Sequence, residues 1–153
     1  VYSVAVMEKT YDIAQLAQMT GLTDRTLRSD LKKGILTGTL LNGKWQCSPQ
    51  QVQQFFDTPA VCARIKAKQD ALIADFLKNA YIQSGAEQLT VLDWPQISPQ
   101  KVQDILDYTL PLVNDPQYER PRFSFRYQNG RARMVLIGSQ PALRRLCGAL
   151  AFE

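Results

Sequence analysis

Residues 11–52, YDIAQLAQMTGLTDRTLRSDLKKGILTGTLLNGKWQCSPQQV, carry the most specific pattern in the chain. Apolar residues near the start of this stretch repeat at the three-to-four residue spacing of one helical face, at Ile13, Leu16, Ala17 and Met19. Asp12 stands where a helix N-cap is expected, and Gly21 can adopt the left-handed backbone that ends a helix. The sequence therefore predicts a first helix between Asp12 and Gly21.

A second helix is predicted over residues 24–33, with Thr23 as its N-cap and Gly34 at its end. Leu27 and Leu31 lie four residues apart and form its buried side. The remaining outer face is mainly basic and consists of Asp24, Arg25, Arg28, Ser29 and Lys32. Two helices joined by a short turn that contains a glycine are typical of a helix-turn-helix, whose second helix enters the major groove of DNA.

A β-hairpin is predicted directly after the second helix. Asn42 and Gly43 form a strong two-residue turn signal, because both tolerate a positive φ, and short apolar arms flank them. A hairpin in this position is interpreted as a wing. Lys44 and Trp45 are expected near its tip, where they would contact DNA phosphates and sugars.

Five short segments follow one another in this stretch: Ile-Ala-Gln-Leu-Ala, Thr-Gly-Leu-Thr, Arg-Thr-Leu-Arg, Lys-Lys-Gly-Ile-Leu and Asn-Gly-Lys. In this order they resemble the DNA-binding domain of MerR-type regulators and the related phage excisionase-like domains. The resemblance covers about the first third of the chain and implies a winged helix-turn-helix that binds a DNA groove. The chain departs from the family pattern at Ser29 and Asp30, where aromatic residues usually stand, and in the wing, which lacks the usual Arg and Tyr.

The helix-turn-helix pattern and this resemblance together define the expected DNA-contacting residues: Thr23, Asp24, Arg25, Thr26, Arg28, Lys32, Asn42, Lys44 and Trp45. The two arginines are expected to anchor phosphates or to read guanine edges, near the positive end of the second helix. Asp24 or Thr23 would discriminate between bases. The two lysines would make salt-sensitive contacts with the DNA backbone.

The chain has 153 residues, 45% hydrophobic content and a net charge of +4. This length suits one domain or two small ones. A net charge this small does not by itself indicate a polyanionic partner. The chain has no histidine, and its cysteines, Cys47, Cys62 and Cys147, are widely spread, so the usual zinc ligands and the usual catalytic base are missing. We expect no metal, no cofactor, no disulfide framework and a reducing, cytoplasmic location.

No apolar run approaches the ~20 residues that span a bilayer, so no membrane partner is expected. Residues 1–6, VYSVAV, lack a basic leader and are too few for a signal peptide. They are interpreted as a tail or an added strand.

The chain carries no pattern typical of an enzyme. Asp93, Asp104 and Asp107 are the candidate acid-base carboxylates, but carboxylates beside a helical stripe usually face solvent. The chain has no glycine-rich phosphate loop and no nucleophile elbow. Cys47 is expected to be either a small buried residue or an exposed, redox-sensitive thiol beside the wing.

Two further helices are predicted before residue 84. Ser48 and Pro49 begin the first, and its buried face is Val52, Phe55 and Phe56. The second runs over about residues 58–81, with a seam at Cys62, Ile65, Gln69, Leu72, Phe76 and Asn79. As in the resembled regulators, this seam would join two chains and place two second helices on DNA half-sites. Alternatively, the helix packs onto its own C-terminal domain.

A change of character at Ser84 and Gly85 indicates a linker, and the remaining sequence predicts a β-α-β-β-α order. Its predicted elements are a strand over residues 87–92, a helix that begins at Ser98-Pro99, a hairpin that turns at Asn129-Gly130, and a helix over residues 140–150. The helix stripes are Val102, Ile105, Leu106 and Leu110, then Leu143, Leu146, Cys147 and Leu150. The resemblance implies effector sensing or oligomerisation for this part.

The predicted hairpin has two different faces. Its buried face would carry Phe123, Phe125, Tyr127, Ala132, Met134 and Leu136. Its opposite face would carry Arg122, Arg126, Arg131 and Arg133. Like charges opposite each other across strands invite an anion, so this face is a candidate site for phosphate, a carboxylate ligand or nucleic acid. The alternative is a solvated face with acidic neighbours.

The sequence thus predicts a mainly α fold with an α+β C-terminal part. Residues 1–58 would form a winged helix-turn-helix, residues 59–84 a connecting or dimerisation helix, and residues 85–153 a small α+β domain. The predicted function is sequence-specific binding of double-stranded DNA by a transcriptional regulator, as a homodimer, with a small-molecule or protein effector. The alternatives are a mobile-element DNA-binding factor of the excisionase, replication or partition type, and a protein-interaction module on a helix-turn-helix shell.

Overall fold

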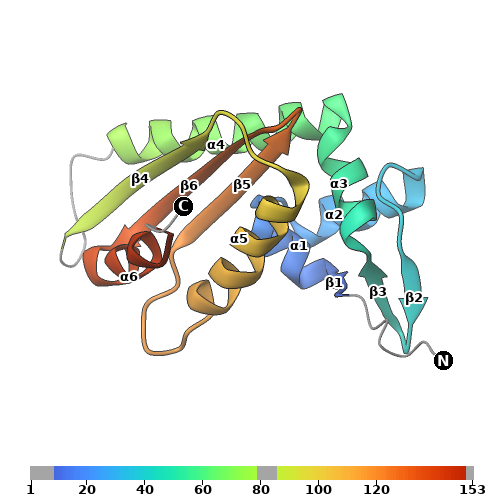
Figure 1. Ribbon diagram of the computed structural model, residues 1–153, viewed down its shortest axis with the longest axis horizontal. Helices are drawn as coiled ribbons and strands as arrows, with labels where there is room; N and C mark the ends of the chain where they lie inside the picture. The colour runs from blue at the N-terminus through green and yellow to red at the C-terminus, as the bar shows by residue number, and fades with distance from the viewer. Residues whose placement is uncertain (1–8, 79–85, 151–153) are drawn as a thin grey trace.

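The computed structural model of the protein describes residues 9–78 and 86–150. Within them the chain forms a mixed α+β fold of six helices and two three-stranded antiparallel sheets (Figure 1). The predictions for residues 1–6, for Asn79 in the helical seam and for a linker at Ser84-Gly85 lie outside the described residues. Among the described helices, none is both long and apolar enough to cross a membrane.

The N-terminal part has the order β-α-α-β-β-α. Its elements are β1 (Tyr11–Asp12), α1 (Ile13–Thr20), α2 (Asp24–Lys33), β2 (Thr39–Leu41), β3 (Lys44–Cys47) and α3 (Pro49–Asp57). The strands pair in the order β1-β3-β2, so the two-residue β1 extends the predicted hairpin into a small sheet. Both predicted helices and the hairpin are confirmed.

Local capping chemistry explains where α1 and α2 begin and end. The Asp12 carboxylate accepts a 2.8 Å hydrogen bond from the backbone N–H of Gln15, whose side chain in turn accepts from the Asp12 N–H. Gly21 (φ 83°) and Gly34 (φ 77°) end the two helices in the left-handed conformation that favours glycine. Thr23 caps α2 through its hydroxyl oxygen, as predicted.

The C-terminal part has the predicted β-α-β-β-α order after one long helix. Its elements are α4 (Pro59–Lys78), β4 (Glu87–Trp94), α5 (Pro99–Val113), β5 (Arg122–Gln128), β6 (Arg131–Ser139) and α6 (Gln140–Leu150). The strands pair in the order β4-β6-β5, so β4, which is distant in sequence, lies beside β6. The predicted cross-strand pairs are confirmed, with Gln128 opposite Arg131 and Arg126 opposite Arg133.

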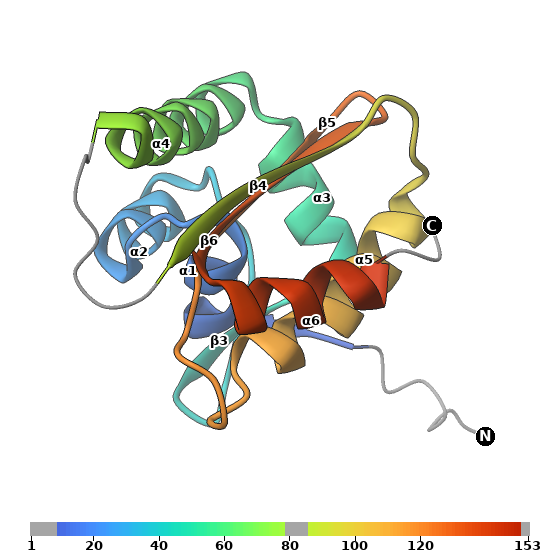
Figure 2. The ribbon, with the colours of Figure 1, turned by 90° about the vertical axis from the view of Figure 1, so that its left-hand side faces the viewer.

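One hydrophobic core runs through both parts of the chain, from Tyr11 to Leu150. The predicted inner face of the β5–β6 hairpin is buried, and Figure 2 shows α1, α3, α5 and α6 on one side of this sheet. Phe56 of α3 meets Phe125 of β5 edge-on, with ring centroids 6.0 Å apart. α1 also packs directly on β5. The N-terminal helices are therefore held on the C-terminal sheet by the same core.

The opposite face of the sheet is covered by α4 (Figure 2). Cys62, Ile65, Gln69 and Leu72 of the predicted seam are buried there, and Leu72 packs on Val135 and Ile137. The structure therefore shows the alternative in which this helix packs onto its own chain. A seam between two chains would need these side chains to be exposed. Periodicity identified the seam but not the surface that it covers, because a dimer interface and an internal face need the same stripe.

Candidate nucleic-acid interface

The predicted outer face of α2 is exposed, because Leu27 is fully buried and turns the opposite side of the helix toward solvent. The side chains of Asp24, Arg25, Arg28 and Lys32 are all exposed there. The Arg28 guanidinium donates a 2.7 Å hydrogen bond to the Asp24 carboxylate, and both side chains are 58% exposed. α2 thus presents one ion pair and three cations, Arg25, Lys32 and Lys33, that have no ion-pair partner among the residues that the structure describes.

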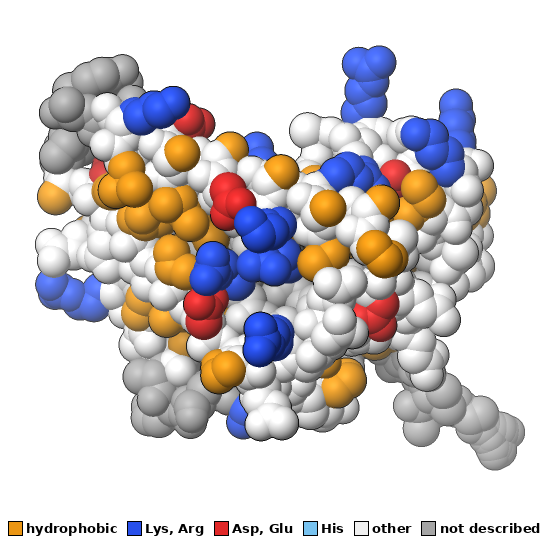
Figure 3. Space-filling model, turned by 90° about the horizontal axis from the view of Figure 1, so that it is seen from above, with side chains coloured by type: hydrophobic (Ala, Val, Ile, Leu, Met, Phe, Trp, Pro, Cys, Tyr) orange, Lys and Arg blue, Asp and Glu red, His pale blue; other side chains and the backbone are white. Residues whose placement is uncertain are grey.

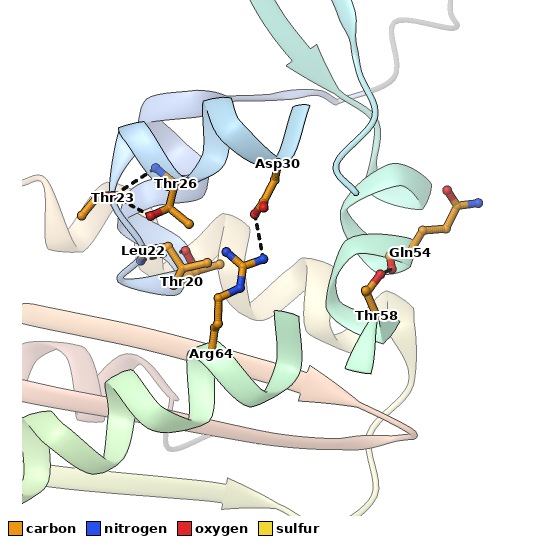
Figure 4. Close-up of polar contacts among 8 residues, drawn as sticks. All are labelled: Thr20, Leu22, Thr23, Thr26, Asp30, Gln54, Thr58 and Arg64. Atoms are coloured by element: carbon orange, nitrogen blue, oxygen red, sulfur yellow. Dashed lines mark hydrogen bonds and ion pairs between the residues drawn. The ribbon is translucent and has the colours of Figure 1, made fainter. Parts of the chain in front are cut away.

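The side chains of Thr23 and Thr26 take part in capping α2 as well as lying at its surface. The Thr23 hydroxyl oxygen accepts the backbone N–H of Thr26 at 3.1 Å, while its own proton goes to the Thr26 hydroxyl oxygen at 2.9 Å (Figure 4). The Thr23 hydroxyl is therefore occupied by capping. The Thr26 hydroxyl keeps its proton available to an acceptor.

The hairpin turns through Asn42 (φ 52°) and Gly43 (φ 79°), and Asn42 and Lys44 are exposed at its tip. Trp45, next to Lys44, is only half-exposed and packs against the core. The pleat explains this difference, because neighbouring residues of β3 point to opposite faces of the small sheet. The exposed apolar residues of the hairpin are instead Leu40 (55% exposed) and Leu41 (51%), which the sequence reasoning did not single out.

A buried ion pair joins α2 to α4. The Arg64 guanidinium donates to the Asp30 carboxylate at 2.9 Å, and the Asp30 side chain is only 4% exposed (Figure 4). The pair lies beside a surface concavity of about 460 Å³, lined by Arg25, Thr26, Ser29, Asp30, Lys33, Ile35, Ala60 and Arg64. The sequence did not single out Lys33 or Arg64, and it placed Ser29 on the outer face of the second helix but not among the expected DNA contacts. The one indication of this site in the sequence was Asp30, a carboxylate that lies next to the apolar stripe of Leu27 and Leu31.

The turn between α1 and α2 rests on the C-terminal sheet. The Ser124 hydroxyl of β5 donates a 2.6 Å hydrogen bond to the backbone carbonyl of Thr20, the last residue of α1. A side chain at Gly21 would come within 3.3 Å of the Ser124 Cβ and 3.4 Å of the Lys68 Cγ, so the turn also contacts α4. The position of α2 is therefore set by β5 and α4 as well as by its own caps.

The four arginines of the predicted anion site do not form one cluster. Arg126 and Arg133 are cross-strand neighbours, and Arg131 is the next residue after Arg133 on the same face, opposite Gln128. Arg122 is separated from these three, since it lies at the other end of the hairpin, opposite Ile137. Ser124, Val135 and Ile137 share this face and are buried under α4.

The central arginines have partners within the chain. Arg133 donates two hydrogen bonds, of 2.7 and 2.9 Å, to the Asp93 carboxylate, and Arg126 donates one of 3.1 Å to the Gln69 side chain. The hydrogen bonds from Arg133 lower the pKa of Asp93 below its ordinary value. Figure 3 shows cationic and acidic side chains mixed in the middle of this face. The acidic neighbours of the alternative are present, but the middle of this face is covered by α4 and is not solvated.

A second concavity, of about 600 Å³, lies between α3 and α5. The two helices begin with nearly the same six residues, Ser-Pro-Gln-Gln-Val-Gln at 48–53 and Ser-Pro-Gln-Lys-Val-Gln at 98–103. From these six residues, each helix contributes a proline, two glutamines and a valine to the lining. Lys9, at one end, lies 3.5 Å from the Asp107 carboxylate, which also accepts a 2.8 Å hydrogen bond from the Tyr11 hydroxyl.

Of the two expectations for Cys47, the structure shows the small buried residue and not the exposed thiol, since its side chain is fully buried beneath the hairpin. Burial raises the pKa of the thiol to about 11. Gly38 lies against it, because a Cβ there would come within 3.1 Å of the Cys47 sulfur. Asp107 and Asp93 hold structural hydrogen bonds, and Asp104 accepts one from Gln100. In the part of the chain that the structure describes, no three His, Cys, Asp or Glu side chains are grouped so that they could hold a metal ion.

The chain matches no protein-family model, no curated protein and no solved structure with significance. Its function must therefore be inferred from the geometry of the surface itself.

Proposed function

We propose that the protein is a sequence-specific DNA-binding transcriptional regulator whose β-α-α-β-β part acts as a winged helix-turn-helix. In this proposal α2 enters the major groove and the β2–β3 hairpin is the wing. The observation that carries it is the exposed, cation-rich face of α2, which begins with a capped and uncrowded N-terminus. The resemblance to MerR-type and excisionase-like DNA-binding domains supports the same assignment.

The distribution of charge on α2 favours DNA over a neutral partner. Arg25, Lys32 and Lys33 are exposed and have no hydrogen-bond or ion-pair partner among the described residues. Unpaired arginine and lysine side chains on one helix release counterions from DNA and supply the electrostatic part of its binding. Arg28 can exchange Asp24 for a guanine edge, because both side chains are exposed and surface ion pairs are weak.

The contacts that hold α2 in place are consistent with a role in reading DNA bases. Base readout requires side chains to be held in register with the duplex. α2 is tied to α4 by Asp30, and the turn that precedes α2 is tied to β5 through Thr20 and Ser124. The proposed reading helix therefore has little freedom to tilt relative to the sheet.

Selection of bound duplexes from a random DNA pool tests the proposal at near-physiological salt. We expect the wild type to enrich one sequence and an Arg25→Ala/Arg28→Ala variant to lose that enrichment. An Arg120→Ala/Arg144→Ala variant is the matched control, because it removes two exposed arginines that lie outside α2, the β2–β3 hairpin and the candidate anion site. Failure of the wild type to enrich any sequence would contradict DNA reading. The homodimer expected from the sequence stays a prediction, which an enriched palindrome would support and a single half-site would oppose.

Leu40 and Leu41 favour a second candidate function, a protein-interaction module. Adjacent exposed leucines on an edge strand are suited to an apolar partner. A photoreactive residue at Leu41 would then capture a partner protein in cells. The same group at Tyr108, an apolar position that is 58% exposed, is the control. Capture at Leu41 alone, together with no enriched DNA sequence, would favour this candidate over DNA binding.

A further inference from the structure

We propose that the concavity between α2 and α4 binds a phosphate group of the DNA backbone, with Arg64 as its central ligand. This assignment rests on the proposed function, because it places a backbone phosphate beside the helix that would read the bases. It adds Arg64, Lys33 and Ser29 to the DNA-contacting surface. None of these three belongs to the set of contacts expected from the sequence.

The buried carboxylate of Asp30 holds Arg64 in place. Asp30 is 4% exposed at its side chain and accepts the Arg64 Nη2–H at 2.9 Å, whereas the Arg64 side chain is 35% exposed. A buried carboxylate needs such a partner, so the guanidinium is fixed at the wall of the concavity (Figure 4). Among the described residues Asp30 is its one hydrogen-bond partner. Its remaining N–H donors are available to a second anion, which the planar guanidinium binds well.

The charge of the concavity also fits a phosphate. Arg25, Lys33 and Arg64 face one carboxylate, Asp30, so positive charge remains in excess after the ion pair has formed. The hydroxyls of Thr26 and Ser29 lie in the same lining and add neutral donors. Cations combined with hydroxyl donors are the usual protein contacts to phosphate oxygens.

The position of the concavity favours a phosphodiester in DNA over a free phosphate ion. Arg25, Ser29 and Lys33 follow one another at four-residue spacing, so they form a line along the side of α2 that faces α4. Arg25 belongs both to this line and to the exposed face of α2. A DNA strand bordering the groove that α2 occupies would therefore run past Arg64.

The salt dependence of DNA binding tests the assignment with the full chain. Each phosphate contact contributes about 0.9 to the slope of log K against log salt, so Arg64→Gln is expected to reduce the slope by about that amount. At 0.15 M salt the same contact is worth about five-fold in affinity, equally for the selected and a scrambled duplex. Lys66→Gln is the matched control, because Lys66 lies on the same helix and pairs with Asp70 away from the concavity.

Two further variants keep the test valid if Arg64→Gln alone disturbs folding. Asp30→Asn/Arg64→Gln replaces the ion pair by an uncharged hydrogen-bonding pair, and Lys33→Gln leaves the pair intact. Both variants should have a lower salt slope than the wild type. Arg64→Lys keeps the positive charge and should therefore retain most of the wild-type slope. If the wild type binds DNA but these variants keep its slope, the phosphate site is wrong and the proposed function stands. If the wild type binds no DNA, the proposed function itself fails.

Inorganic phosphate distinguishes the two sources of the anion. We expect millimolar inorganic phosphate, titrated into the wild type and followed by NMR, to cause no saturable shifts around Arg64. Saturable binding that Arg64→Gln abolishes, combined with an unchanged salt slope for DNA, would assign the concavity to a free phosphate and overturn the DNA-backbone assignment.

Discussion

The Ser124 hydroxyl donates a 2.6 Å hydrogen bond to the carbonyl of Thr20, across 104 residues of sequence. The Ser124 carbonyl in turn accepts a 3.0 Å hydrogen bond from the Gln69 side chain of α4, and all three residues are buried. Thr20 ends α1 and its hydroxyl accepts the N–H of Leu22 in the following turn. One buried polar chain therefore connects the α1–α2 turn, the sheet and the long helix.

Ser124→Ala should lower the free energy of unfolding by ~1–3 kcal/mol, because it removes a hydrogen bond to a buried carbonyl and leaves that carbonyl without this donor. Urea unfolding of the two proteins measures the difference. Thr37→Ala, at an exposed position, is the control and should change stability by less than about 0.5 kcal/mol. Equal stabilities for Ser124→Ala and the wild type would show that the hydrogen bond does not support the turn.

Asp93 gives the protein a pH-dependent contribution to stability. Its pKa is lowered in the folded chain by the hydrogen bonds from Arg133, so this contribution is present above the unfolded pKa of ~3.9 and is lost as the pH falls through the folded pKa. Asp93 is 53% exposed, so Asp93→Asn should cost only ~0.2–1 kcal/mol at pH 7. Urea unfolding at pH 7 and pH 2 should show this difference shrinking toward zero. A difference that stays constant with pH would contradict the ion pair.

The three cysteines should react at different rates in the folded protein. Cys47 is fully buried with a pKa of about 11, Cys62 is also buried, and Cys147 is partly exposed. Iodoacetamide at pH 8 should therefore modify Cys147 first, because alkylation needs an accessible thiolate. Mass spectrometry of the labelled peptides follows each site, with urea-unfolded protein as the control in which all three react. Rapid labelling of Cys47 in the folded chain would be inconsistent with its burial.

Asp24→Asn should strengthen binding to any duplex by about two- to five-fold, if α2 lies against DNA. The substitution removes a negative charge from the binding face and releases Arg28 from its 2.7 Å ion pair, so one more cation meets the phosphates. Fluorescence anisotropy with a scrambled duplex measures the change. Asp75→Asn on the exposed side of α4 makes the same change in charge elsewhere and should leave affinity unaltered. Equal gains from both variants would indicate a net-charge effect alone.

Local chemistry made much of the fold predictable. Asp12, Thr23 and the glycines at 21 and 34 end or begin helices through contacts within a few residues, and the sequence displays such contacts directly. The Asn129-Gly130 turn likewise sets the pairing of β5 and β6, because a two-residue loop leaves one register.

Tertiary contacts account for what the sequence did not reveal. Asp30 and Arg64 are 34 residues apart, and no local pattern joins a carboxylate to a guanidinium at that distance. The burial of Cys47 and the partial burial of Trp45 depend on which face of a short hairpin meets the core, and alternation over a few residues leaves that open. The same holds for α4, whose stripe could have met another chain as readily as its own sheet.

The core shared by α1, α3 and β5 bears on how such a chain can change over evolution. A DNA-binding domain that has a hydrophobic core of its own can be recombined with different sensor domains. Here Leu16 and Phe56 belong to the same hydrophobic core as Phe125 and Leu136. Residues 9–57 would therefore expose apolar surface if they were joined to a different domain. The two halves of this protein therefore depend on each other for burial of their apolar surfaces. If α2 reads DNA as proposed, changes of specificity would come from substitutions on its exposed face and along the hairpin.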